Sequence, residues 1–198
     1  MKKIILTDCD GVLVNWNDGF DKFMLEQGYP RIPWTDHEYS IAVRHGITHQ
    51  QAQKFVAEFN ESSRIANLGP FADSVEYVKK LADEGFRFIV VTSISDAPQA
   101  NFYRTQNLIS IFGDIFDEIV CLEMGISKAH ELQRWAGTGY FWIEDHMRQA
   151  EAGYEVGLRT ILINHPYNAH YGTDLFPKVS YKSPWQEIYA MVHNVYDN

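Results

Sequence analysis

Cysteine and basic residues are both scarce in this chain of 198 residues. The two cysteines, Cys9 and Cys121, are too few to form a disulfide framework, so a reducing, cytoplasmic setting is the simplest expectation. Lys and Arg number 17 against 26 acidic residues, which gives a formal net charge of -9 at pH 7. This balance argues against binding to nucleic-acid polymers or to membrane surfaces, because both depend on clustered Lys and Arg.

Long apolar runs are also missing from the sequence. No run approaches the ~20 residues that a bilayer-spanning helix requires. The apolar start at residues 4–6 is followed by Asp8 and Asp10, where a secretory signal would stay apolar, so secretion is not expected. Internal repeats and the nucleophile-elbow, Walker and dinucleotide-binding motifs are absent as well. The composition is 45% hydrophobic, and the length fits one domain with a modest insertion.

Short apolar runs alternate with segments of helical periodicity over most of the chain. The strands that this pattern predicts are residues 3–7, 86–91, 116–121, 140–143 and 159–163. Helices are predicted between them, and a last helix begins at Pro184 behind the capping residue Ser183. The strands are almost continuously apolar, as expected when both faces of a sheet are covered. The pattern therefore predicts an α/β fold with a doubly wound parallel sheet.

Residues 15–68, hereafter the inserted segment, have a different texture. Gln, His and Glu are frequent at 49–59, which favours a helix, and a proline-containing bend spans 29–34. No clear strand is visible in the segment, and Gly69-Pro70 closes it. We expect a helical insertion after the first strand, with a core formed by residues 1–14 and 69–198.

Polar side chains follow three of the predicted strands, at the point where each strand ends. They are Asp8, Asp10, Thr92, Ser93, Glu144 and Asp145. In open parallel sheets, ligands bind beyond the carboxyl ends of the strands, so these residues should converge on one rim. Two like charges ~4 Å apart repel by about 4 kcal/mol at an effective dielectric near 20, so four carboxylates require a counter-ion. Carboxylate oxygens with few histidines suit Mg²⁺.

Four short motifs carry a resemblance to a known superfamily. Asp8-x-Asp10-Gly11-Val12, then Thr92, then Lys128, then Glu144-Asp145 resemble, in order and context, the motifs of haloacid dehalogenase-like phosphatases. The resemblance covers nearly the whole chain, and the inserted segment occupies the position of that superfamily's small helical cap. Within it, residues 8–13 followed by Asn15-Trp16 and Phe20 are most similar to the 5'(3')-deoxyribonucleotidases. Glu144-Asp145 looks more like the general phosphatase branch than the Asp-Asp of those nucleotidases.

The resemblance implies a reaction and a metal. Asp8 would be the nucleophile that forms an aspartyl-phosphate, and Asp10 would act as general acid and base. We expect neighbouring acids to raise the pKa of Asp10, as that role requires. The metal would be Mg²⁺, held by Asp8, by the main-chain carbonyl of Asp10 and by Asp145, with Glu144 reaching it through water.

Further residues are implied to hold the substrate. Thr92, Ser93 and the backbone around Gly11 would contact the phosphoryl oxygens. The cation that completes this set is either Lys128, the superfamily lysine, or Arg104, which occupies about the place of the phosphate-binding lysine in the deoxyribonucleotidases. Lys128 is the favoured of the two.

Several residues admit a plainer interpretation. Trp16, Phe20 and Trp34 would stack on a nucleobase, or would simply pack within the inserted segment, and the sequence favours neither. Cys9 points away from the flanking acids, which indicates core packing. His45 and His49 have i,i+4 spacing but lack the intervening Glu of a zinc-protease motif, so a role in helix packing or at the surface is expected.

The expected function is a Mg²⁺-dependent phosphatase acting on a small phosphorylated metabolite, with a nucleoside monophosphate as the favoured substrate. A sugar phosphate is the alternative substrate. A non-catalytic phospho-receiver also uses acids, Thr and Lys on a parallel sheet, but the Gly11-Val12 context and the inserted segment argue against it. A dehalogenase would lack Asp10. The oligomeric state stays open.

Overall fold

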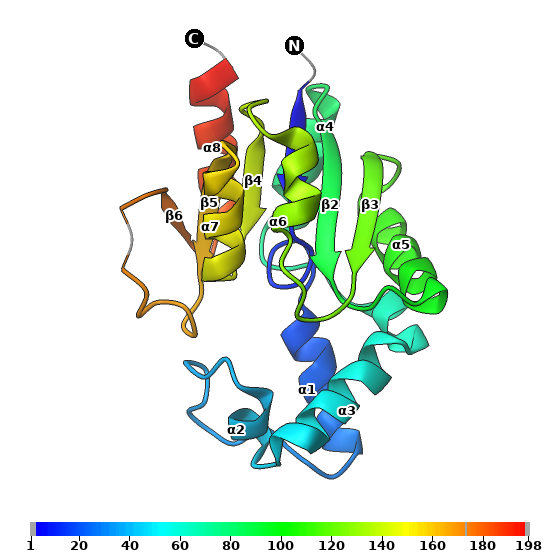
Figure 1. Ribbon diagram of the computed structural model, residues 1–198. Helices are drawn as coiled ribbons and strands as arrows, with labels where there is room; N and C mark the ends of the chain where they lie inside the picture. The colour runs from blue at the N-terminus through cyan, green and yellow to red at the C-terminus, as the bar shows by residue number, and fades with distance from the viewer. Residues whose placement is uncertain (1–2, 173, 197–198) are drawn as a thin grey trace.

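The computed structural model describes residues 3–172 and 174–196 (Figure 1), so residues 1–2, 173 and 197–198 of the expected core lie outside the described residues. Six strands of the described chain form one parallel sheet in the order β3-β2-β1-β4-β5-β6. Their bounds are β1 Ile4–Thr7, β2 Arg87–Ser93, β3 Phe116–Leu122, β4 Phe141–Glu144, β5 Arg159–Asn164 and β6 Lys178–Ser180. The predicted doubly wound parallel α/β sheet is confirmed.

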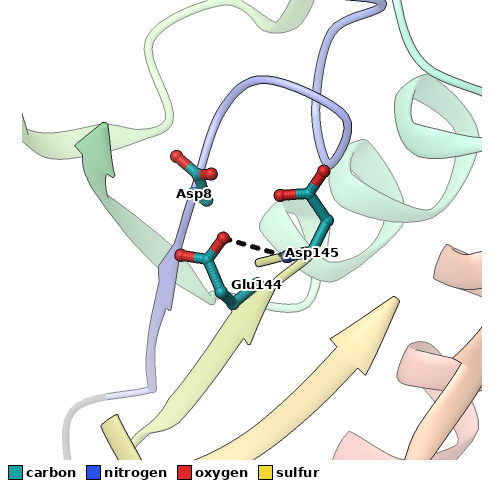
Figure 2. Close-up of side chains that lie close together, drawn as sticks. All are labelled: Asp8, Glu144 and Asp145. Carbon is teal, nitrogen blue, oxygen red and sulfur yellow. Dashed lines mark hydrogen bonds between the residues drawn. The ribbon is translucent and has the colours of Figure 1, made fainter. Parts of the chain in front are cut away.

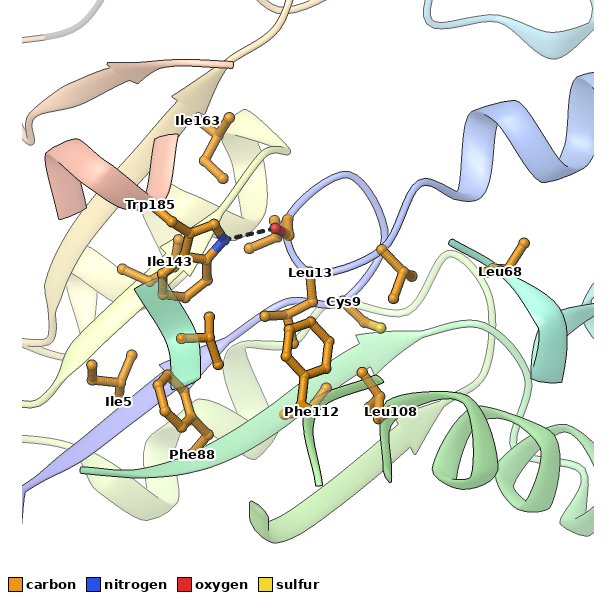
Figure 3. Packing of buried hydrophobic residues seen from close by; sticks show 14 of the residues in the cluster. Ile5, Cys9, Leu13, Leu68, Phe88, Leu108, Phe112, Ile143, Ile163 and Trp185 are labelled. Atoms are coloured by element: carbon orange, nitrogen blue, oxygen red, sulfur yellow. Dashed lines mark hydrogen bonds between the residues drawn. The ribbon is translucent and has the colours of Figure 1, made fainter. Parts of the chain in front are cut away.

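Helices cover both faces of the sheet, as its continuously apolar strands require. Ile5 of β1 packs in a cluster with side chains of α4, α5 and α8, whereas Ile4 and Leu6 pack on the other face with Leu132 of α6. Figure 3 shows the first cluster, in which the indole of Trp185 also donates a hydrogen bond to the Val12 carbonyl at 2.8 Å. The core helices are α4 Ser74–Asp83, α5 Pro98–Phe112, α6 Ala129–Leu132, α7 Met147–Glu155 and α8 Pro184–Tyr196, with a short 3₁₀ turn, η2, at Gln133–Trp135.

The strand register brings the expected site residues to one edge. Thr7 of β1 pairs with Val90 on one side and with Ile143 on the other, and the Asp8 N–H donates to the Ile143 carbonyl at 2.8 Å. Asp8 therefore lies beside the end of β4, where Glu144 is the last residue. Both side chains are placed at the carboxyl edge by ladder hydrogen bonds rather than by a flexible loop.

The inserted segment lies beyond that same edge of the sheet (Figure 1). Within residues 15–68, all of which are described, the structure contains helices and no strand. These helices are α1 Trp16–Glu26, α2 Ile41–His45, α3 His49–Asn60 and η1 Ser63–Asn67. Phe20, Phe23 and Phe59 form their aromatic core. His45 is a packing residue, buried at 4% exposure with a ring nitrogen 2.9 Å from the Tyr29 carbonyl.

Some boundaries differ from those expected. The strand β6 has three residues, too few to show an apolar pattern, and it was not predicted. The helix predicted between the strands at 116–121 and 140–143 is divided into α6 and η2. None of the helices in the described part of the chain has the length and apolar character that crossing a bilayer takes.

Candidate active site

Three carboxylates meet at the carboxyl edge of the sheet (Figure 2). Asp8, Glu144 and Asp145 each offer an oxygen within 4.8 Å of the others, and all three residues are buried. Lys128 stands beside α6, and its Nζ lies 2.8 Å from Asp8 Oδ1 and 2.8 Å from Glu144 Oε2. Three carboxylates facing one ammonium leave a net charge of -2 when all are ionised. A divalent cation would balance that charge, and oxygen donors are those that Mg²⁺ prefers.

Burial and charge act strongly on this cluster. Burial raises the pKa of Glu144 well above 4.5, and the neighbouring charge of Asp8 adds to the effect. Burial acts to lower the pKa of Lys128, but Asp8 and Glu144 outweigh it and raise that pKa above its usual value. The ammonium of Lys128 is therefore held in its charged form, and it is one positive charge beside three carboxylates. This imbalance fits a cation site.

Glu144 also shapes the turn that follows β4. Its Oε1 accepts hydrogen bonds from the N–H groups of Asp145 and His146, both at 3.0 Å. Since its Oε2 contacts Lys128, both oxygens of Glu144 already have partners. Asp145, by contrast, directs its carboxylate toward Asp8 across the edge of the sheet.

Two residues that the sequence analysis missed hold Asp145 in place. The Tyr167 hydroxyl donates a short hydrogen bond to Asp145 Oδ2, and Asn168 Nδ2 donates to the Asp145 carbonyl at 2.6 Å. Both lie in the loop after β5. Ligands gather beyond the carboxyl ends of parallel strands, and β5 was among the predicted strands. The loop that follows β5 could therefore have been searched for site residues from the sequence.

Gly11 is required where the first loop passes the carboxylates. Its φ is +73°, in the left-handed region, and a Cβ there would collide with the Asp145 carboxylate. The Gly11 carbonyl is 2.9 Å from His165 Nε2, which ties the loop to the segment after β5. The sequence Asp10-Gly11 thus allows the backbone to approach the cluster closely.

Asp10 lies on the same loop and is held by a different cation. Arg104 of α5 is fully buried, and its Nη2 lies 2.5 Å from Asp10 Oδ1. Burial raises the pKa of Asp10 to about 6, against the opposing charge of Arg104. Among the described residues, the carboxylate oxygens that lie within 4.8 Å of one another are those of Asp8, Glu144 and Asp145, and the Asp10 side chain is not one of the group.

A cavity of about 650 Å³ opens above these groups. Its lining includes all but one of the residues predicted for the site: Asp8, Asp10, Gly11, Trp16, Thr92, Ser93, Lys128, Glu144 and Asp145. Arg104 is not among the described residues that line it. Thr92 Oγ1 and Ser93 Oγ are buried there with no hydrogen-bond partner among the described residues. Such unsatisfied hydroxyls fit donors to a bound oxyanion.

The inserted segment supplies the opposite wall of the cavity. Its lining residues are Trp16, Asn17, Glu38, Tyr39, Ile41, Arg44, Val56 and Asn60. The Trp16 ring stacks on the Phe20 ring with 4.5 Å between centroids, and its Nε1 donates to Asn60 Oδ1 at 2.9 Å. Trp16 therefore packs within the segment, and it also lines the cavity. Trp34 does not line this cavity in the described structure and is 90% exposed. Cys9 is fully buried in the core, as its position on the first loop indicated.

The chain is similar in structure to haloacid dehalogenase-like hydrolases. One from Streptococcus pneumoniae matches with a TM-score of 0.65 at 14% identity, over 96% of this chain and 97% of that one. D,D-heptose 1.7-bisphosphate phosphatase from B. bronchiseptica, complexed with magnesium and phosphate, matches with a TM-score of 0.59 at 12% identity, over 96% and 99%. A variant of CbbY from Rhodobacter sphaeroides, in complex with xylulose-(1,5)bisphosphate, gives 0.56 at 15%, over 92% and 96%. The fold is therefore the haloacid dehalogenase-like fold.

Sequence comparison adds one relative. It is described as an uncharacterized 32.4 kDa protein in the Gp30-rIII intergenic region of Enterobacteria phage T4. The two are 26% identical over an alignment of 145 residues, and the match covers 65% of this chain and 48% of the relative, so this chain spans about half the length of the curated protein it matches. No protein-family profile matches the chain.

Proposed function

We propose that this protein is a Mg²⁺-dependent phosphomonoester hydrolase that acts on a small metabolite, through an aspartyl-phosphate on Asp8. The observation that carries the proposal is the juxtaposition of Asp8 with Lys128 at 2.8 Å, beside Glu144 and Asp145, at the floor of a cavity. The haloacid dehalogenase-like fold supports it, since its solved relatives include a phosphatase complexed with magnesium and phosphate.

The reaction divides one difficult displacement into two. A carboxylate oxygen of Asp8 attacks phosphorus, the bond from phosphorus to the alcohol oxygen breaks, and Asp10 gives its proton to that oxygen. Water then attacks the phosphorus of the aspartyl-phosphate, Asp10 takes up the proton, and Asp8 is released with inorganic phosphate. A pKa of about 6 for Asp10 suits a group that must both give and accept a proton near neutral pH.

The donor set fits a magnesium ion. Asp8, Asp145 and the main-chain carbonyl of Asp10 would hold it, and Glu144 would reach it through water because its own oxygens already contact Lys128 and two N–H groups. When bound, Mg²⁺ supplies positive charge that offsets the carboxylates and the phosphoryl oxygens. Lys128, Thr92 and Ser93 would bind those oxygens, and the N–H groups near Gly11 would add to them.

We favour a nucleoside monophosphate, ribo or deoxy, as the substrate. The inserted segment, residues 15–68, would act as a cap over the core and place Trp16, Ile41 and Val56 around the organic group. A volume of about 650 Å³ is in the range of small-molecule sites and accommodates a nucleoside. A sugar phosphate is the second candidate, because solved relatives are a heptose bisphosphate phosphatase and a protein in complex with xylulose bisphosphate.

One panel tests both levels of the proposal. The protein is assayed with Mg²⁺ against nucleoside monophosphates, deoxynucleoside monophosphates and sugar phosphates, alongside Asp8→Asn. We expect turnover of at least one class by the wild type and none by the variant. Turnover that survives in Asp8→Asn would remove the nucleophile assignment. Preference for sugar phosphates would remove the nucleotide assignment alone.

A further inference from the structure

Arg44 of α2 is a buried charged residue at the cavity that the proposed reaction does not use. It lines the cavity and is 3% exposed. Its Nη1 donates to Asn17 Oδ1 at 2.6 Å and its Nη2 donates to Asp21 Oδ1 at 2.7 Å. Its Nε is buried with no hydrogen-bond partner among the described residues. The guanidinium therefore has unused donor capacity, in a residue that lines the cavity.

Arg44 has one carboxylate partner, Asp21, and it shares that partner with a second arginine. Asp21 is shared, because Arg31 Nη1 lies 3.0 Å from its other oxygen. Arg31 has a second carboxylate partner in Asp36, at 2.7 Å, whereas Asn17, the other partner of Arg44, is neutral. Burial lowers the pKa of Arg44 from its usual value, and the charge of Asp21 opposes that effect. A buried guanidinium is costly unless acceptors surround it, so this one gains from any acceptor that enters the cavity.

The position of Arg44 indicates which part of a bound substrate would lie near it. Asp8 and Lys128 line the cavity from the core side, and Arg44 lines it from the inserted segment. Ile41 and Val56 contribute apolar wall on the same segment. A substrate whose phosphoryl group sits at Asp8 would therefore present its organic part to the segment that carries Arg44.

We propose that Arg44 is a specificity-determining residue, which donates hydrogen bonds to an oxygen acceptor on the organic part of the phosphomonoester. The proposal rests on the phosphohydrolase function above and deepens it. Two kinds of substrate carry a strong acceptor of this sort: a nucleotide whose base has a carbonyl, as every common base except adenine does, and a sugar bisphosphate, through its second phosphate. A phosphomonoester whose organic part has no such oxygen gains nothing from Arg44.

The variant Arg44→Met tests this, because it keeps much of the side-chain volume and removes every donor. The probes are dUMP, fructose 1,6-bisphosphate and phenyl phosphate, of which the last has no acceptor beyond its phosphate ester. We expect kcat/KM for the better of the first two probes to fall about 10- to 100-fold, mainly through KM, as for loss of a hydrogen bond from a charged group. With phenyl phosphate kcat/KM should change by no more than about threefold, because this substrate has no acceptor for Arg44 and its other contacts are kept. The probe that responds identifies the source of the acceptor.

Arg31→Met is the matched control. Arg31 binds the same Asp21 carboxylate but is not among the described residues that line the cavity. We expect it to lower stability without changing the ratio of the two kinds of substrate. The assignment of Arg44 is overturned if Arg44→Met slows phenyl phosphate as much as the acceptor-bearing probes, or if it leaves all of them unchanged.

A binding measurement separates this proposal from the proposed reaction. Calorimetry with Asp8→Asn records affinity for dUMP and fructose 1,6-bisphosphate without turnover, and adding Arg44→Met should weaken the affinity for one of them by the same factor. If the wild type hydrolyses none of the probes but this binding difference persists, the reaction is wrong and the role of Arg44 stands. Equal affinities in the two backgrounds, or no binding at all, would overturn the role of Arg44.

Discussion

Arg104 Nη2 lies 2.5 Å from Asp10 Oδ1, and this ion pair, in which Arg104 is buried and Asp10 is partly exposed, joins α5 to the loop after β1. The two cations that the sequence offered for the phosphate thus occupy different places. Lys128 contacts Asp8 and Glu144 and lines the cavity, whereas Arg104 binds Asp10 and is not among the described lining residues. We therefore assign phosphate binding to Lys128 as a proposal, and treat Arg104 as a positioning residue for Asp10.

Replacing Arg104 should affect the rate far more than substrate binding. In Arg104→Met, Asp10 loses the group that fixes its carboxylate, and a misplaced acid lowers kcat by about 100-fold. KM should change less than about twofold, because the residues that bind the substrate itself are kept. Breaking this pair also lowers stability, by less than the about 3–5 kcal/mol of a fully buried pair, so the folded fraction is checked by circular dichroism at the assay temperature. Arg104→Lys should restore part of kcat. A change confined to KM would contradict the positioning role.

Tyr167 should tune the metal site through Asp145. Its hydroxyl donates to Asp145 Oδ2, so Tyr167→Phe removes the contact that orients this carboxylate. Loss of such a supporting contact weakens metal affinity by about 10- to 100-fold. The measurement is the Mg²⁺ concentration at half-maximal activity, together with calorimetric binding of Mg²⁺. Tyr171→Phe, on the same loop and 47% exposed, is the control and should match the wild type. Equal Mg²⁺ dependence in all three proteins would count against this role.

We expect Gly11 to tolerate no side chain because a Cβ there would meet the Asp145 carboxylate, and Gly28 serves as the control. In Gly11→Ala the new Cβ meets both a positive φ of 73° and the Asp145 carboxylate. In Gly28→Ala the φ is 85°, and no described atom lies within 4 Å of the Cβ. Placing alanine at a positive φ costs about 1–2 kcal/mol in both variants, so this cost does not distinguish them. A difference in activity between the two variants would therefore come from the contact with Asp145. We expect Gly11→Ala to lose Mg²⁺-dependent activity while Gly28→Ala keeps it. Equal activities would show that the approach of Gly11 to Asp145 is unimportant.

Glu84 should make a small contribution to stability that depends on pH. Burial acts to raise its pKa, but hydrogen bonds from Tyr189 at 2.5 Å and His193 at 2.7 Å outweigh it and lower the pKa below 4.5. Because the folded pKa is depressed, the contribution is present above the unfolded pKa and is lost as pH falls through the folded value. Glu84→Gln should lower the free energy of unfolding by less than about 1 kcal/mol at pH 7. Urea denaturation should find the difference smaller at pH 3, and a difference that grew with acidity would refute this linkage.

The sheet was predictable because its strands are short, apolar and separated by helical patterns. Once Asp8 and Glu144 are placed at the ends of two strands, the parallel register brings them together without further information. The same reasoning placed Thr92 at the rim. The strand β6 escaped because three residues carry no periodic signal.

Contacts between distant segments were beyond the reach of pattern alone. The pairing of Arg104 with Asp10 spans 94 positions in the chain, and no local spacing indicates it. Tyr167 and Asn168 are ordinary loop residues until the loop after β5 is folded back on Asp145. In the sequence Arg44 is one charge among several in the inserted segment, and only the packing of that segment against the core gives it a place at the cavity.

The central claim is that Asp8 is the residue that becomes phosphorylated. Rapid acid quenching of a single turnover, with a substrate labelled in its phosphate, would trap an acyl phosphate that can be located by peptide mapping. We predict label on the peptide that contains Asp8, formed and lost within one turnover in the presence of Mg²⁺, and no label in Asp8→Asn. Release of phosphate at the full rate with no labelled peptide, or label on a different residue, would contradict the account.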